Sequence, residues 1–211
     1  MVKLADLWVN LFGRRLRLEY SKNIPSPDGR LVCHFSVKAG KASYTVKKDG
    51  KVILRKSFLG LAIRDDKPLA NNLAYIRSHE KAYDTTLESL VGEQRLIRNN
   101  YHEIAFYLAE AEENGRIFTV RFRVFDDGVA FRYEIPPQPR FQRLIIQDEL
   151  TEFNVDVNGH AWQIPAYQPD RYEYNYEHWS VGSLKNSVHT PLTIETPLGH
   201  YLSIPEAALY N

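Results

Sequence analysis

Carboxylates are the first side chains in this sequence that could do chemistry. Asp148, Glu149 and Glu152 form the densest acidic cluster in its second half. Paired carboxylates can carry out glycoside hydrolysis or hold Ca²⁺, and the commoner explanation of such a cluster is a charged turn at a strand end. Glu206 is a lone carboxylate just past a predicted strand. Taken alone, it indicates only an ordinary loop charge.

An aromatic, polar segment lies between Trp162 and Trp179, with Tyr167 inside it. Aromatic side chains can cover the apolar face of a sugar ring while nearby carboxylates and amides bond its hydroxyls. The alternative is that these rings fill the core or cover a partner domain. The periodicity of the segment is weak, so it predicts surface loops or irregular strands.

Several classes of protein do not fit the composition. The net charge is +1, so no field of one sign would draw the chain to nucleic acid. We find no phosphate loop, Rossmann glycine run or zinc-ligand spacing. We expect no membrane span, because no apolar run is long enough, and residues 1–18 do not form a clear signal peptide. The single cysteine, Cys33, is predicted to be a small buried hydrophobe.

The best-determined local element is a β-hairpin over residues 118–135. Apolar and polar residues alternate on both sides of Asp127-Gly128, a favoured two-residue turn. That turn would pair Val124 with Phe131 and place Arg121 opposite Glu134. It would also place Arg123 opposite Arg132. An arginine-rich face of this kind can bind an anion or pack against acidic neighbours.

The rest of the chain predicts an all-β protein. Aromatic and β-branched residues are frequent, and turn signals at 26–29 and 49–50 and around 197–199 separate short strand-like runs. At least ten short strands in 211 residues favour a large sandwich. Residues 71–100 are more polar and predict one or two strands, of which 73–78 is the better marked, and a loop around Gly92. A short amphipathic helix is the expectation near the N-terminus, over residues 4–12.

Five stretches, in order along the chain, resemble the N-terminal domain of glycoside hydrolase family 97. They are residues 26–29, residues 92–93 with 97–99, and residues 122–133, 148–153 and 201–209. The resemblance covers residues 25–211 and leaves residues 1–24 as an N-terminal extension. It implies a β-supersandwich of the galactose-mutarotase-like type. It also implies that a (β/α)₈ catalytic barrel, absent from these residues, follows this domain in the complete enzyme.

The resemblance carries functional expectations as well. The family hydrolyses α-glucosides or α-galactosides and uses Ca²⁺, with the catalytic carboxylates in the barrel, so no catalytic residue is expected here. Glu206 matches the family glutamate that ligates Ca²⁺, while Pro205 stands where the family has histidine. Substrate contacts are expected from Trp162, Tyr167 and Glu206 with an α-linked gluco- or galacto-oligosaccharide. A periplasmic or exported location is implied too.

Two other functions remain open at this point. The chain could be a standalone carbohydrate-binding module without hydrolytic activity, or a purely structural sandwich. A reading frame that continues into a barrel would favour the glycosidase, and a stop codon would favour either alternative.

Overall fold

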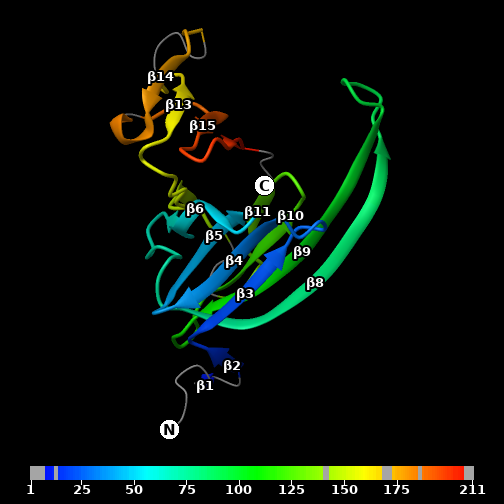
Figure 1. The fold of residues 1–211 in the computed structure, drawn as a ribbon. Helices are drawn as coiled ribbons and strands as arrows, with labels where there is room; N and C mark the ends of the chain where they lie inside the picture. The colour runs from blue at the N-terminus through cyan, green and yellow to red at the C-terminus, as the bar shows by residue number, and fades with distance from the viewer. Residues whose placement is uncertain (1–7, 12–13, 140–142, 168–172, 185–186, 207–211) are drawn as a thin grey trace. The chain divides into compact units, whose positions relative to one another are not determined.

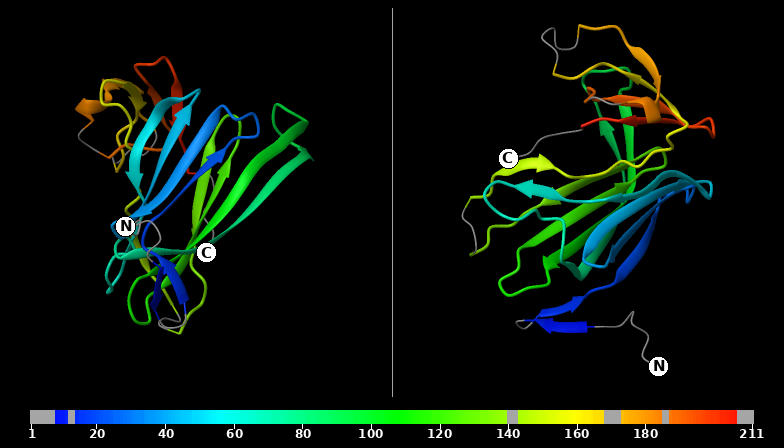
Figure 2. Two further views of the ribbon diagram at one scale, coloured as in Figure 1. Left: turned by 60° about the horizontal axis from the view of Figure 1, so that its bottom comes forward. Right: turned by 90° about the vertical axis from the view of Figure 1, so that its left-hand side faces the viewer.

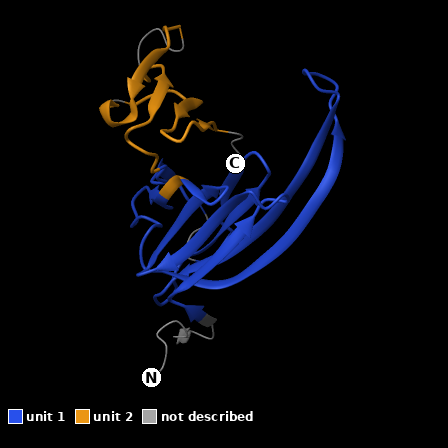
Figure 3. Cartoon of the chain, in the orientation of Figure 1, with its two compact units in different colours: residues 1–52, 56–153 blue, residues 53–55, 154–211 orange. Residues whose placement is uncertain are grey.

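A computed structural model describes residues 8–11, 14–139, 143–167, 173–184 and 187–206. The chain divides into two compact units (Figure 3). Unit 1 comprises residues 1–52 and 56–153, and unit 2 comprises residues 53–55 and 154–211. Each unit is considered by itself below.

Unit 1 is built from antiparallel strands (Figure 1). They are β1 (Trp8–Leu11), β2 (Arg14–Arg17), β3 (Tyr20–Pro25), β4 (Leu31–Lys38), β5 (Lys41–Lys48), β6 (Lys51–Phe58, of which residues 53–55 belong to unit 2), β7 (Leu61–Ile63), β8 (Leu73–Glu88), β9 (Leu96–Glu110), β10 (Ile117–Val124), β11 (Val129–Glu134) and β12 (Ile146–Glu149). One sheet has the order β1-β2-β8-β9-β10-β11 and another the order β3-β4-β5-β6. β7 and β12 form a third, two-stranded sheet.

The core of unit 1 lies between its two large sheets. Figure 2 shows them as separate layers, β3 to β6 in blue to cyan and β8 to β11 in green. Alternate residues of β4 and β10 are buried, as their period of two requires. Phe35 of β4 stacks on Phe106 of β9 with ring centroids 3.9 Å apart, and Tyr44 of β5 reaches Phe122 of β10. The expected all-β sandwich is therefore confirmed.

The predicted hairpin is present, but its predicted register is wrong. Val124 pairs with Val129, and the Phe125 N–H donates to the Gly128 carbonyl at 2.8 Å, so Asp126-Asp127 forms the turn. Each β10 residue therefore faces a partner two positions earlier than expected, and Phe122 faces Phe131. Because the shift is two residues, every side chain keeps its face, and the two apolar faces still coincide.

The arginine-rich face is satisfied by acidic neighbours. Arg121 lies opposite Arg132, and Glu134 accepts hydrogen bonds from both. Glu103 of β9 accepts from Arg121 at 2.7 Å and from Arg123 at 2.8 Å. Hydrogen bonding from Arg121 is the largest influence on Glu134, and the pKa of that carboxyl is lowered. The acidic-neighbour explanation accounts for this face, so we assign no anion site to it.

Two other turns and the cysteine agree with the sequence. Asp49 and Gly50 have φ angles of 48° and 77°, as the turn between β5 and β6 requires. The Gly29 N–H donates to the Ser26 carbonyl at 3.0 Å. Cys33 is fully buried, and desolvation raises the pKa of its thiol to about 12, so it behaves as an inert hydrophobe.

The strands β8 and β9 are longer than the sequence predicted. The structure continues β8 from Leu73 to Glu88 and pairs it with β9 down to Leu96, so strand extends well beyond the predicted 73–78. Gly92, with φ of 107°, lies in the turn between them. Neither face of the outer part is buried, so no strict apolar alternation marks it in the sequence.

The N-terminal extension differs from the expected short helix where the structure describes it. Trp8–Leu11 and Arg14–Arg17 are paired antiparallel strands, while residues 1–7 and 12–13 lie outside the described part. Among the described residues, no helix has the length and hydropathy needed to cross a bilayer.

Candidate functional site

Unit 2 holds the sequence-predicted site residues. Its elements are β13 (His160–Gln163), β14 (Glu177–Ser180), a 3₁₀ turn (Val181–Ser183), β15 (Leu192–Glu195) and β16 (Tyr201–Ile204). The strands form one antiparallel sheet in the order β14-β13-β15-β16. The β15–β16 hairpin around residues 197–199 agrees with the sequence prediction, and Gly199 has the positive φ of 74° that its turn uses.

One face of this sheet is the core of unit 2. Ala161 and Ile194 are buried there, opposite each other on β13 and β15. At its margin, the amide nitrogen of Gln163 donates to Glu177, and the indole N–H of Trp179 donates to the same carboxylate at 3.0 Å. Trp179 is therefore held by a hydrogen bond within unit 2 and is only half-exposed.

The other face carries a row of aromatic rings, which we call the ring row: His160, His178, Trp162 and Tyr201. Trp162 lies opposite His178, and the two rings stack with centroids 4.5 Å apart. His178 also approaches His160, at 5.1 Å, and Tyr201 stacks near Trp162, at 6.0 Å. Because the strands alternate their side chains, these four residues share one sheet face.

The packing of the ring row limits where a sugar could lie. His178 covers one side of Trp162, and Tyr201 stands on the other at a spacing too small to admit a sugar ring. Tyr201 is on β16, the last strand of the sheet, and is 65% exposed. The side of the Tyr201 ring that faces away from Trp162 is therefore the aromatic surface of the ring row that is open to solvent. Glu195 lies opposite Tyr201, and its negative charge raises the pKa of the Tyr201 phenol.

Tyr167 stands apart from the ring row in the loop after β13. Its side chain is 91% exposed, and its backbone has a φ of 59°. A bulky residue in the left-handed region is uncommon, and such strain is concentrated at functional sites. Trp162 and Tyr167 are thus both in unit 2, but nothing in the described contacts brings their side chains together.

Glu206 lies just after β16, exposed, where the sequence placed it. A carboxylate is the hard oxygen ligand that Ca²⁺ prefers, but Ca²⁺ takes six to eight oxygens. Within the part of the chain that the structure describes, no three acidic, histidine or cysteine side chains gather closely enough to hold a metal ion. Among the described residues, Glu206 alone therefore does not make a Ca²⁺ site.

The carboxylate cluster at 148–152 has local partners. Glu152 accepts a hydrogen bond from the Phe58 N–H at 3.1 Å, and Asp148 accepts from the Glu149 N–H at 2.9 Å. Asp148 and Glu149 belong to β12, which pairs with β7. These contacts support the charged strand end that was the commoner explanation.

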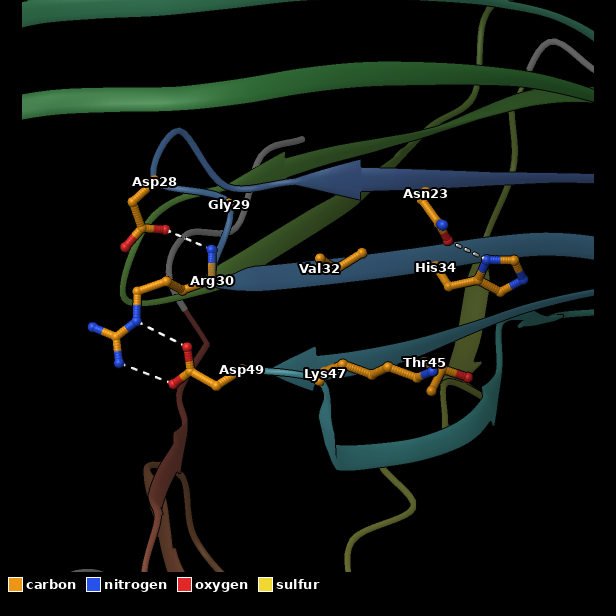
Figure 4. A pocket seen from close by; sticks show the side chains of 10 residues that line it. Asn23, Asp28, Gly29, Arg30, Val32, His34, Thr45, Lys47 and Asp49 are labelled. Carbon is orange, nitrogen blue, oxygen red and sulfur yellow. Dashed lines mark hydrogen bonds and ion pairs between the residues drawn. The ribbon is translucent and has the colours of Figure 1, made fainter.

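A shallow depression of about 800 Å³ lies on unit 1, over β3 to β5 (Figure 4). His34 Nδ1 and Asn23 Oδ1 are 2.6 Å apart, and Arg30 donates two hydrogen bonds to Asp49. Burial, with Lys47 nearby, lowers the pKa of His34. Asn23 and His34, and Arg30 and Asp49, are thus paired with each other, and no Trp, Tyr or Phe lines the depression, so we do not place the sugar site here.

Sequence reasoning selected Trp162 but missed His160, His178 and Tyr201. The His-x-Trp spacing of β13 was a usable signal, because residues two apart share a strand face. The sequence could not supply the pairing that brings β14 and β16 beside them.

With this geometry established, comparison with known proteins gives the family. The model of the glycosyl-hydrolase 97 N-terminal domain matches residues 24–211. The chain belongs to glycoside hydrolase family 97. The match confirms the resemblance seen in the sequence, and it spans both structural units.

Solved structures agree with that assignment. The family 97 domain is similar to an enzyme of this family from Pseudoalteromonas sp. strain K8, solved as a variant with panose and separately with acarbose, at 32% identity and a TM-score of 0.84 in each case. Each alignment covers 89% of this chain and 28% of the solved chain. A β-arabinopyranosidase, 22% identical with a TM-score of 0.80, shares the fold over 89% of this chain and 32% of its own. The family 97 domain thus spans less than a third of the length of these structures.

Proposed function

We propose that this family 97 domain forms part of an exo-acting α-glycosidase whose catalytic carboxylates lie in a (β/α)₈ barrel after residue 211. The observation that carries the proposal is the family match over residues 24–211, together with a relative that has been solved with panose and acarbose. Panose is built from α-linked glucose, which supports an α-gluco-oligosaccharide as substrate. An α-galactoside is the alternative. The enzyme's expected location is periplasmic or exported.

In this proposal the domain contributes binding groups and no acid or base. Glu206 supplies one carboxylate to a Ca²⁺ site that barrel residues complete. When bound, the ion supplies a fixed positive charge near the sugar. Tyr167 and the outward side of Tyr201, which stacks near Trp162 in the ring row, cover apolar sugar surface, with Glu206 beside the substrate. The exposure of Tyr167 and Glu206 leaves both free to reach a second domain.

Removal of the Glu206 carboxylate is expected to weaken Ca²⁺ binding by at least about 10-fold in the protein that includes the barrel. The reason is that one oxygen donor is lost while the others remain. Calorimetric titration with Ca²⁺ of wild type, Glu206→Ala and Glu206→Gln measures this loss. Glu113→Ala is the matched control, because Glu113 is an exposed glutamate of unit 1.

The same titration on the 211-residue chain should show only weak binding in wild type and variant alike. The chain alone should also release no sugar from a nitrophenyl α-glucoside or α-galactoside. Tight Ca²⁺ binding by the 211-residue chain that depends on Glu206 would contradict the shared site. A standalone binding module would then be the better conclusion.

Replacement of Tyr167 by alanine is expected to raise KM of the longer enzyme for an α-gluco-oligosaccharide by about 2- to 10-fold, the range given by an aromatic contact of about 0.5–1.5 kcal/mol. Folding should be unaffected, because the side chain is 91% exposed. Tyr176→Ala is the control, since Tyr176 is also an exposed tyrosine of unit 2. Equal KM values for Tyr167→Ala, Tyr176→Ala and wild type would remove Tyr167 from the substrate site.

A further inference from the structure

The outer part of the β8–β9 hairpin is a two-stranded arm without neighbouring strands. We define the arm as residues 83–88 and 96–101, with the connecting turn. The pairing of β9 with β10 ends at His102, and β2 pairs with β8 only at Tyr75. Among the described strands, none pairs with either edge of the arm, and Figure 1 shows its two green ribbons running beyond the rest of unit 1.

One face of the arm is charged and already paired. Asp84 accepts two hydrogen bonds from Arg98, at 2.9 and 2.8 Å, and Glu88 accepts one from Arg95 at 2.8 Å. Asp84 and Glu88 are four residues apart and so share this face. This charged face of the arm can therefore stay exposed to solvent, and we do not expect it to be the face that contacts another domain.

The opposite face carries two apolar cross-strand pairs, Tyr83 with Tyr101 and Leu87 with Ile97, whose exposure increases toward the tip. The polar pair Thr85 and Asn99 lies between them. Near the body of unit 1, Tyr101 is buried between Tyr83 and Phe125, with centroids 4.8 and 4.9 Å from it. Further out, Leu87 lies opposite Ile97 with exposures of 53% and 43%.

The turn that closes the arm continues this pattern. Leu90 and Val91 are 96% and 83% exposed there. A two-stranded hairpin is at best marginally stable in water, and clustered apolar exposure of this kind marks an interaction surface.

The chemistry of the exposed side chains indicates what covers them. Beyond Tyr83 the exposed apolar residues are leucine, isoleucine and valine, which pack against protein and lack the flat rings that favour sugars. The similar family 97 structures are more than three times as long as the aligned part, so most of such an enzyme lies outside this chain.

We infer that the apolar face of the arm docks on the part of the glycosidase polypeptide that follows residue 211. This inference rests on the proposed function, because it requires that continuation. It adds a specific contact surface, centred on Leu87 and Ile97 and extended by Leu90 and Val91. The arm thereby becomes an element that fixes the domain to the catalytic region.

Hydrogen exchange measured by mass spectrometry tests this inference. The arm amides should exchange at least 10-fold more slowly in the longer protein than in the 211-residue chain. Leu87→Glu should abolish that difference, because it places a charge in the contact. Thr86→Glu is the matched control and should preserve it, since Thr86 is the neighbouring exposed residue on the charged face.

Each other outcome overturns the inference in a recognisable way. An active longer glycosidase whose arm exchanges as fast as in the 211-residue chain would leave the proposed function standing and remove the docking surface. A 211-residue chain that dimerises in sedimentation, with the dimer broken by Leu87→Glu, would assign the face to a second copy. A gene that ends after residue 211 would exclude both the inference and the proposed function.

Discussion

Replacement of Arg116 by methionine is expected to destabilise unit 1 by about 3–5 kcal/mol, as happens when one partner of a buried ion pair is removed. Arg116 is 1% exposed, and its guanidinium donates to Glu110, 2% exposed, with an Nε–Oε2 distance of 2.8 Å. It also donates to the backbone carbonyls of Lys67 and Pro68. Methionine would leave the Glu110 carboxylate and both carbonyls buried without these donors. Chemical denaturation of the 211-residue chain measures the free energy of unfolding.

Two further variants separate charge from packing. Arg132→Met removes an arginine that pairs with Glu134 but is 51% exposed, and it should cost less than about 1 kcal/mol. The double variant Arg116→Met, Glu110→Gln should be more stable than Arg116→Met alone, because the fully buried Glu110 charge is then removed as well, while Asp66, the other partner of Arg116, is 33% exposed. If Arg116→Met costs no more than Arg132→Met, the buried pair does not stabilise the fold as argued.

Replacement of Phe106 by alanine is expected to cost about 3–5 kcal/mol as well, through lost burial and the cavity left behind. Phe106 is fully buried between the two large sheets. Its ring lies 3.9 Å from Phe35 and 6.2 Å from Phe122, measured between centroids. Thermal and chemical unfolding of the variant would measure the loss.

The control for this prediction is Phe153→Ala. Phe153 is 41% exposed at the edge of the same aromatic cluster, near Tyr44 and Phe131. Phe153→Ala should lower the free energy of unfolding by clearly less than Phe106→Ala, because folding removes less of the Phe153 side chain from water. A similar cost for both variants would mean that the contact between the sheets is not where unit 1 gains its stability.

The Arg116–Glu110 pair and Phe106 stabilise unit 1, and they affect function only through that stability. One strand of the arm is the outer part of β9, which also carries Phe106 and Glu110. Loss of the core would therefore disturb the proposed docking surface, whereas Leu87→Glu acts on an exposed side chain. This difference in burial makes Leu87 the more specific probe of assembly.

The sequence by itself determined the fold class, the family and several local elements. Alternation in 118–135 predicted a hairpin, Asp49-Gly50 predicted a turn, and Cys33 was predicted to be buried. Each depends on interactions between residues close in sequence or on burial of one strand face, which a periodic pattern records. The strand-like run over residues 200–204 also placed Glu206 just past a strand end, where the structure has it.

Only the tertiary structure decided the register of that hairpin, the length of the arm and the composition of the ring row. The Asp126-Asp127 turn replaced Asp127-Gly128, and either choice keeps the apolar faces together, so the pattern could not distinguish them. His160 and His178 meet because β13 pairs with β14 across a long loop. Pairings between distant segments depend on the whole sheet, and no local pattern records them. For the same reason, the sequence marked β8 clearly only over residues 73–78, because the outer part of this strand is exposed on both faces.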